Sequence, residues 1–199
     1  MVLEIKSKDV KGGLTYTIQN IVVKDTFDLE ENLNLKELST KISNTEYNPD
    51  RFPGLFIRYT HPKCVIIFFS NGKLILTGIK LFNQIDLIIK RLIFKLNDIF
   101  EVQIDPNSIQ PKIVNIVITA NFYKKINLNL AVLKLDNSIY EPETFPGLVY
   151  KTTTPIKSVF LIFSTGKIVF TGISEKKMIK PALKHLGNLL DAEDLFITS

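Results

Sequence analysis

The segment that decides the fold is Tyr47-Asn48-Pro49-Asp50-Arg51-Phe52-Pro53-Gly54-Leu55, which recurs 93 residues later as Tyr140-Glu141-Pro142-Glu143-Thr144-Phe145-Pro146-Gly147-Leu148. Two further segments repeat in the same order: Phe69-Ser70-Asn71-Gly72-Lys73 as Phe163-Ser164-Thr165-Gly166-Lys167, and Thr77-Gly78-Ile79 as Thr171-Gly172-Ile173. Ordered matches with only small insertions indicate two copies of one structural unit. Two copies form a pseudo-symmetric pair rather than a solenoid.

The repeat divides the chain into a lead-in at 1–14, a first repeat at 15–104, a linker at 105–110 and a second repeat at 111–199. The hydrophobic fraction of 45% and the charged fraction of 23% are those of a folded protein. The net charge of +5 is compatible with an anionic partner. The single cysteine, Cys64, lies in an apolar run, so we expect a packed thiol in a protein of a reducing compartment.

Residue patterns within each repeat alternate between strands and helices. Strands are expected at 16–23, 55–59, 64–69 and 74–77, and at 112–119, 148–152, 159–163 and 168–171. Asn34 is expected to cap a helix over Leu35, Leu38 and Ile42, and Asn129 a shorter helix in the second repeat. Apolar stripes predict long helices over 82–100 and 175–190.

This order predicts an α+β fold in which helices cover one side of an antiparallel sheet and leave the other face free. Alternation along the strands places mostly apolar side chains, with one Asn and one Thr per repeat, on that free face. Such a face needs a partner. From periodicity alone, a second sheet or a dimer interface explains it equally well.

The motif Tyr-x-Pro-x-x-Phe-Pro-Gly-Leu, followed by Phe-Ser-x-Gly-Lys and Thr-Gly-Ile, resembles the core of the TATA-box-binding protein family across residues 16–190. That family is itself a reference example of minor-groove kinking. The resemblance implies a pseudo-twofold saddle, with a curved antiparallel ten-stranded sheet and four main helices on its convex side. It also implies a general transcription initiation factor that binds and bends A·T-rich promoter DNA and nucleates assembly of the preinitiation complex.

The resemblance also assigns roles to residues. Two pairs of phenylalanines, Phe52 with Phe69 and Phe145 with Phe163, would each open one base step. The remaining minor-groove contacts would be Asn20, Asn115, Thr77, Thr171, Val22, Val117, Ile67, Leu161, Ile75, Val169, Pro53 and Pro146. Phosphates would be bound by Arg58, Lys73, Lys80, Lys151 and Lys167.

Two departures separate the repeats. The spacing between the paired phenylalanines is 17 residues in the first repeat and 18 in the second, so a longer turn or a bulge must keep Phe163 in register. Ser174 stands where Lys80 stands in the first repeat, which removes one phosphate candidate there.

The expected partners are TATA-box DNA, transcription factors of the IIB and IIA types and the RNA polymerase machinery, with a weak homodimer in the absence of DNA. Glu141 and Glu143 are candidates for the contact with transcription factor IIB; the alternative is a pair of solvated loop acids. We expect no membrane contact and no cofactor. Localisation is expected in a nucleus, with an archaeal cytoplasm or nucleoid as the alternative.

Three other functions remain in view: a nuclease or glycosylase, a TATA-box-binding protein paralogue that scaffolds transcription factors with weak or no TATA specificity, and a sheet that binds apolar ligands or proteins. Metal-assisted phosphoryl chemistry needs convergent carboxylates. The acidic residues are expected on helices and loops, none on the free face, and His61 and His185 have no ligand partners nearby in sequence. We therefore expect that the protein is not an enzyme.

Overall fold

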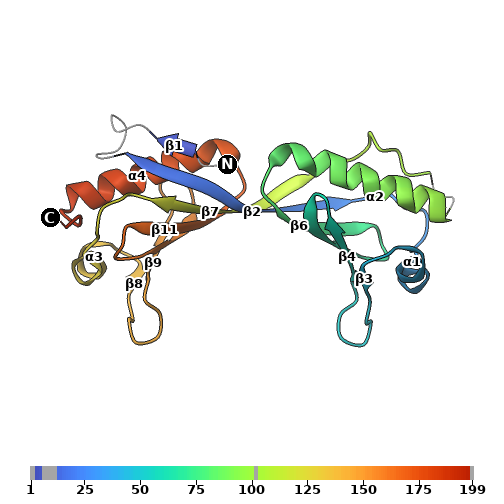
Figure 1. The fold of residues 1–199 in the computed structure, drawn as a ribbon, viewed down its shortest axis with the longest axis horizontal. Helices are drawn as coiled ribbons and strands as arrows, with labels where there is room; N and C mark the ends of the chain where they lie inside the picture. Colours follow the sequence, from blue (N-terminus) through green and yellow to red (C-terminus); the bar gives the residue numbers. More distant parts are fainter. Residues whose placement is uncertain (1–2, 6–12, 101–102, 198–199) are drawn as a thin grey trace. The chain divides into compact units, whose positions relative to one another are not determined.

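The computed structural model describes residues 3–5, 13–100 and 103–197 (Figure 1). The chain divides into two compact units. The first unit is Asn20–Val114, and the second combines Met1–Gln19 with Asn115–Ser199. Strand β2 (Leu14–Thr26) contributes residues to both units.

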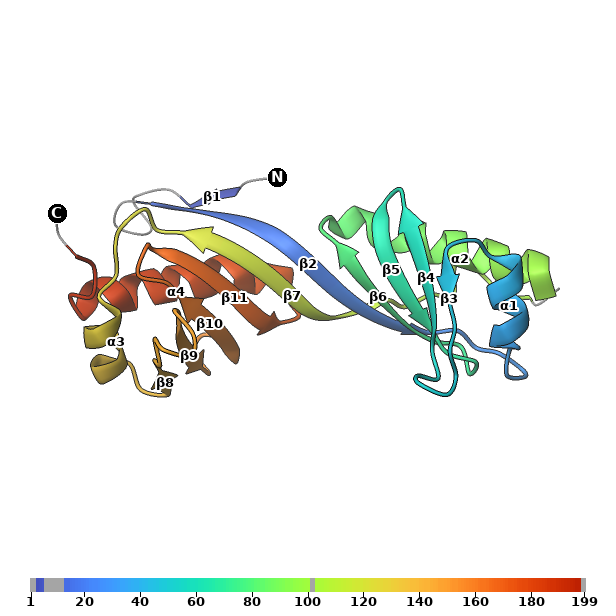
Figure 2. The ribbon, with the colours of Figure 1, turned by 60° about the horizontal axis from the view of Figure 1, so that its bottom comes forward.

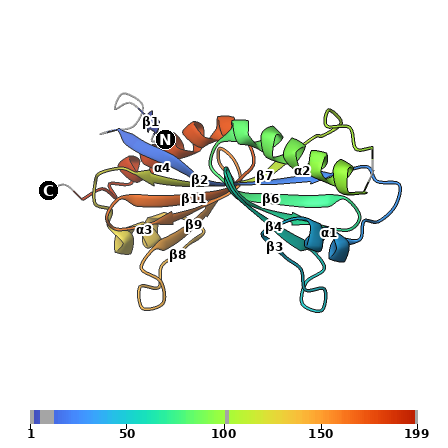
Figure 3. The same cartoon turned by 45° about the vertical axis from the view of Figure 1, so that its right-hand side comes forward.

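In the first unit, antiparallel neighbours follow the order β3, β4, β5, β6, β2 (Figure 2). The elements are α1 (Leu35–Lys41), β3 (Thr45–Glu46), β4 (Leu55–Thr60), β5 (Lys63–Phe68), β6 (Lys73–Ile79), the 3-10 turn η1 (Phe82–Gln84) and α2 (Ile85–Phe100). Figure 3 shows α2 against one side of these strands, and the loop between β3 and β4 extending beyond the strand ends.

The second unit repeats this order as β8, β9, β10, β11, β7. Its elements are β7 (Lys112–Asn121), α3 (Leu128–Lys134), β8 (Ser138–Ile139), β9 (Leu148–Thr152), β10 (Ser158–Ile162), β11 (Lys167–Ile173), the 3-10 turn η2 (Lys176–Met178) and α4 (Ile179–Ala192). A short strand β1 (Leu3–Ile5) pairs with β2. Within the described residues, β2 to β11 give the ten strands that the resemblance implies.

Burial alternates along the strands because only one sheet face carries a helix. On β4, Leu55, Ile57 and Tyr59 are buried, whereas Phe56 is half-buried and Arg58 is exposed. Each long helix buries one stripe of apolar side chains. In α2 the buried residues are Ile85, Ile88, Ile89, Leu92, Ile93 and Leu96. This confirms an α+β fold whose antiparallel sheet is covered by helices on one side only.

Helix capping confirms one sequence-based prediction and corrects another. The Asn34 side chain accepts hydrogen bonds from the backbone of Lys36 and Glu37 at the start of α1. In the second unit Asn127, not Asn129, caps α3 and accepts from the Leu130 N–H. Asn129 lies inside that helix, and both helices have seven residues, so the prediction of a shorter second helix was also wrong. The error came from aligning the Leu-Asn-Leu motifs: the loop before α1 is two residues longer than the loop before α3.

The extra residue before Phe163 is accommodated in the turn between β9 and β10. That turn runs from Thr153 to Lys157, and the Ser158 hydroxyl donates to the Ile156 carbonyl within it. The strand that follows keeps its register, since Val159 pairs with Lys151 as Val65 pairs with Arg58. The longer turn therefore leaves the position of Phe163 unchanged relative to its strand.

Candidate nucleic-acid interface

The two phenylalanine pairs lie on the helix-free side of their units with the same geometry. Ring centroids are 5.9 Å apart for Phe52–Phe69 and 5.8 Å apart for Phe145–Phe163, and both pairs meet edge to face. Phe52 and Phe145 are 38% and 36% exposed, which is unusual for large apolar rings. Each unit thus presents one aromatic pair to its surroundings.

Glycine lets these rings lie against the sheet. A Cβ atom at Gly54 would stand 2.6 Å from the Phe52 ring, and one at Gly147 would stand 2.7 Å from the Phe145 ring. A side chain at either glycine would therefore push the rings from their observed positions, which accounts for the glycine of the Phe-Pro-Gly motif.

Backbone hydrogen bonds hold both members of each pair. The N–H of Phe52 donates to Asn48 O at 3.0 Å, and the N–H of Phe145 donates to Glu141 O at 2.9 Å. Phe69 and Phe163 each donate to the carbonyl of the lysine that ends the following turn, at 2.9 Å. All four phenylalanines are therefore anchored by hydrogen bonds of their own backbones.

A β-bulge positions the asparagine and threonine of the first unit. Ile21 pairs with Ile79 but Val23 pairs with Leu76, so β6 carries one extra residue around Gly78, whose φ is +85°. The N–H of Gly78 donates to Asn20 Oδ1 at 2.8 Å, and Asn20 also hydrogen-bonds the Thr77 hydroxyl. The asparagine side chain thereby binds a backbone donor that the sheet leaves unpaired.

The second unit builds the same arrangement. Its register shifts between Phe170 and Ile173, and Gly172 has a φ of +89°. Gly172 N and the Thr171 hydroxyl donate to Asn115 Oδ1 at 3.0 and 3.1 Å. Binding of Oδ1 in this way orients each amide, so Asn20 and Asn115 are brought together with their predicted threonine partners.

One row of side chains crosses the helix-free face of each unit in identical register. In the first unit the row is Glu46, Phe56, Ile67, Ile75 and Lys24. In the second it is Ile139, Val149, Leu161, Val169 and Thr119. The predicted groove residues Ile67, Ile75, Leu161 and Val169 are half-buried members of these rows, and Val22 and Val117 are half-buried on the same side as the asparagines.

Several members of this face were missed by sequence reasoning. Phe56 and Val149 alternate with buried residues of β4 and β9, so alternation on those strands could have found them. Glu46 lies at the sheet edge beside Phe56, which corrects the expectation that no acidic residue belongs to this face. The two-residue strand that carries Glu46 is too short to leave a pattern in the sequence.

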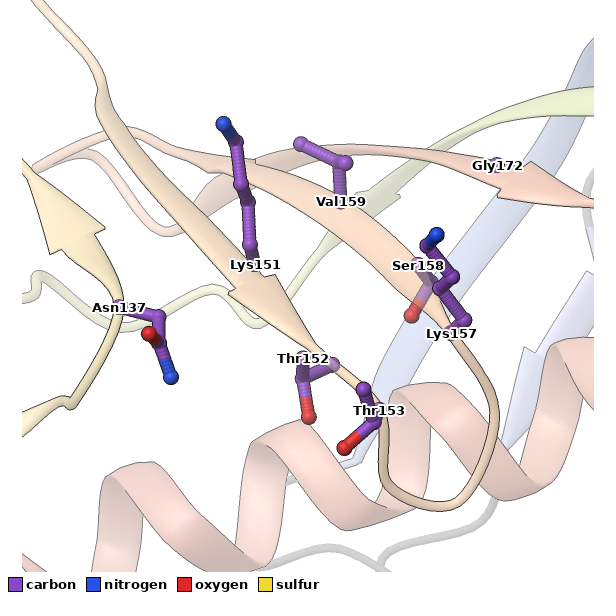
Figure 4. Close-up of a pocket in the computed structure, with 8 residues that line it drawn as sticks. All are labelled: Asn137, Lys151, Thr152, Thr153, Lys157, Ser158, Val159 and Gly172. Carbon is purple, nitrogen blue, oxygen red and sulfur yellow. The ribbon is translucent and has the colours of Figure 1, made fainter.

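The predicted phosphate-binding side chains, Arg58, Lys73, Lys80, Lys151 and Lys167, are all exposed. Arg58 forms an ion pair with Glu46, at 3.1 Å between Nη2 and Oε2. In the second unit Lys151 and Lys157 line a cavity of about 380 Å³ together with Val159 (Figure 4). Lys151 points away from α4, whereas Thr152 and Thr153 point toward it. Lys157 is a cation that the sequence analysis did not select.

The prolines Pro53 and Pro146 and the acids Glu141 and Glu143 are exposed in the loops that precede β4 and β9. Cys64 is buried, as expected, and burial raises the pKa of its thiol to about 11. Burial also raises the pKa of the Tyr59 phenol to about 12, against the opposing charge of Arg91, whose guanidinium lies 4.7 Å from the ring centroid. Neither group is poised as a nucleophile at neutral pH.

No cluster of three or more His, Cys, Asp or Glu side chains suited to a metal ion occurs among the residues that the structure describes. None of the helices in the described ranges is long and apolar enough to span a membrane.

Comparison with known proteins identifies the architecture. Residues 15–99 and 110–192 match the family model described as "Transcription factor TFIID (or TATA-binding protein, TBP)". The chain belongs to the TATA-binding protein family. The two matched stretches correspond to the two repeats seen in the sequence, and each contains one aromatic pair. The family is one of DNA-binding transcription factors rather than of enzymes.

Individual relatives agree with the family model. A TATA-box-binding protein from Pyrobaculum islandicum is 40% identical over 180 residues, covering 90% of this chain and 87% of the relative. One from Aeropyrum pernix is 41% identical over 182 residues, covering 90% and 86%. The solved structure of Methanococcus jannaschii TBP superposes with a TM-score of 0.80 at 36% identity, covering 89% of this chain and 98% of that one. The fold class implied by the sequence is thus confirmed.

Proposed function

We propose that this member of the TATA-binding protein family initiates transcription by binding and bending A·T-rich promoter DNA through the helix-free faces of both units. The observation that carries the proposal is the aromatic pair that each unit presents on its helix-free side, packed closely against a glycine. Rings inserted between base pairs kink a duplex toward the major groove at a cost of a few kcal/mol per step. An apolar sheet face that fits the opened minor groove offsets that cost.

The residues between the aromatic pairs support a preference for A·T pairs. Asn20 and Asn115 have Oδ1 bound by a backbone N–H, which favours presentation of the amide donors to adenine N3 and thymine O2. The groove floor, formed by Val22, Ile67 and Ile75 and their counterparts, offers no acceptor for the guanine amino group. Readout of this kind separates A·T from G·C without a unique base code.

Partners and location follow as further parts of the proposal. The exposed acids Glu141 and Glu143 lie in the loop before Phe145 and are suited to contact a basic surface of a IIB-type factor. The other proposed partners are a IIA-type factor and the polymerase machinery. In the absence of DNA, weak self-association would occur through the apolar faces. The relatives reported above are archaeal, which favours an archaeal cytoplasm over a nucleus.

A duplex labelled with a fluorescence donor and acceptor at its ends tests the proposal. We expect a large decrease in end-to-end distance on binding to a TATA duplex, and weaker binding with little bending for a G·C-rich duplex of equal length. A TATA duplex that stays straight and binds no better than the G·C-rich duplex contradicts the proposal. Bound but unbent DNA with no base preference would instead support the scaffolding paralogue.

A further inference from the structure

The first unit carries a third aromatic ring, Phe56, beside its wedge pair Phe52–Phe69, whereas valine occupies the matched position of the second unit. The Phe56 ring centroid lies 5.4 Å from that of Phe52, in a tilted arrangement. Phe52 is therefore in contact with Phe56 on one side and with Phe69, at 5.9 Å, on the other. At the matched position of the second unit the row contains Val149, which cannot form a ring contact with Phe145.

Strand geometry fixes Phe56 more tightly than a loop residue could be fixed. Phe56 lies within β4 and pairs with Glu46 on one side and Ile67 on the other. Its strand neighbours Leu55 and Ile57 are fully buried on the opposite face. Phe52, by contrast, lies in the loop before β4 and is 38% exposed. A loop ring that packs against a strand ring loses rotamer freedom before it meets any ligand.

We infer that Phe56 is a positioning residue that holds Phe52 in its wedge conformation, so that the first unit opens its base step more readily than the second. The inference rests on the function proposed above and adds that the two units differ in how readily they unstack their base steps. Ordering a side chain in advance removes part of the cost of binding. The two-ring wedge of the second unit must pay that ordering cost on the DNA.

Replacement by the residue of the other unit tests this role. In Phe56→Val the backbone, the register and the β-branched neighbours are all compatible with valine, because Val149 occupies the matched site. Aromatic pairs contribute enough for their loss to weaken binding by about threefold to tenfold. Phe56→Tyr keeps the ring and should bind as the unmodified chain does. Val149→Phe adds a third ring to the second unit.

The readout is 2-aminopurine placed at either end step of an asymmetric A·T-rich duplex, where its fluorescence rises on unstacking. Phe52→Ala and Phe145→Ala assign each end to a unit. We expect Phe56→Val to lower the signal only at the first unit's end, and Val149→Phe to raise it only at the other. Equal loss at both ends, or no loss at either, overturns the positioning role. If the unmodified chain unstacks neither step, the proposed function itself fails, and the two failures are thereby distinguished.

Discussion

The two units share a backbone and differ in what they place upon it. The row across the helix-free face reads Glu46, Phe56, Ile67, Ile75, Lys24 in the first unit and Ile139, Val149, Leu161, Val169, Thr119 in the second. The third and fourth positions are aliphatic in both units. At the other three positions the first unit has an acid, an aromatic ring and a lysine, where the second has isoleucine, valine and threonine. The wedge distances and the asparagine–glycine hydrogen bonds are nearly equal in the two units. What is repeated is therefore the geometry of the aromatic pair and of the asparagine, and what varies is the charge and the aromatic content around them.

The loops that follow the central strands show the same contrast in charge. After β2 the first unit carries Asp28, Glu30 and Glu31, whereas after β7 the second carries Lys124 and Lys125. The Lys124 ammonium lies 5.2 Å from the centroid of the Phe196 ring, which orders part of that basic loop. Phosphate repels the first loop and attracts the second, so we expect the second unit to supply more of the salt-dependent affinity.

The largest expected effect comes from removal of one wedge ring. Phe69→Ala or Phe163→Ala should weaken TATA binding about tenfold or more, because each removes a stacked ring from an opened step. Both rings are half-buried and lie on the helix-free side of their units, so the fold should persist. Fluorescence anisotropy gives the affinity, the labelled duplex gives the bend, and circular dichroism checks folding. Unfolding of both variants would show that these rings belong to the core.

A smaller effect is expected for the cations, and here the units should differ. Arg58 is held by Glu46, but Lys151 has no acidic residue at the matched position, where Ile139 stands. Exposed ion pairs contribute about 0.2–1 kcal/mol, and Arg58 must give up its pair to reach a phosphate. Lys151→Ala should weaken binding about fivefold and Arg58→Ala about twofold.

Glu46→Gln is the matched control for this pair of variants. It frees Arg58 without changing the size of the neighbour, so binding should strengthen about twofold. The slope of log K against log salt should fall in magnitude by about one for Lys151→Ala. An unchanged slope would mean that Lys151 does not contact a phosphate. A larger loss of affinity in Arg58→Ala than in Lys151→Ala would contradict the expected difference between the units.

Sequence reasoning located the strands and the long helices because their signals are local. Alternating and 3.6-residue periods, and turns that contain Pro or Gly between paired strands, can be recognised without knowledge of the partner strands. Asn129 was misassigned because a repeated Leu-Asn-Leu motif outweighed a two-residue difference in loop length. The pairing of Glu46 with Phe56 and the contact of Phe56 with Phe52 depend on strand register, which the sequence of one strand does not determine.

The residues of the candidate site were predicted from the sequence, but the backbone geometry that brings them together was not. Family resemblance supplied Asn20 and Thr77, but the reason for their pairing is the bulge at Gly78, which exposes an N–H for Asn20 to bind. A bulge is a property of two strands together. Lys24, by contrast, follows Asn20 and Val22 at a spacing of two, so alternation along β2 alone could have assigned it to the free face.

The smallest expected effect concerns a buried acid of the first unit that has no acidic counterpart at the matched position of the second. Asp25 is 9% exposed on β2, and the matched position in the second unit is Ala120. Burial raises the pKa of this carboxyl above its ordinary value of 3.8, against hydrogen bonds from the backbone of Thr26 and Gln110. The folded chain therefore disfavours the charged form. The resulting cost is absent below the ordinary pKa, appears as pH rises through it, and is complete above the raised pKa of the folded state.

Asp25→Asn should therefore stabilise the chain at pH 7 and lose that advantage as the pH is lowered toward 4, since protonation then neutralises Asp25 as well. The asparagine carbonyl keeps an acceptor for the Thr26 N–H, which now lies 2.9 Å from Asp25 Oδ1. Asp25→Ala, the residue of the second unit, removes the charge and this hydrogen bond together, and should gain less. Urea denaturation midpoints at the two pH values measure the difference. A midpoint that falls at pH 7 for Asp25→Asn would mean that the two backbone donors outweigh burial, and that the first unit uses this carboxylate as a structural anchor for β2 that the second unit does without.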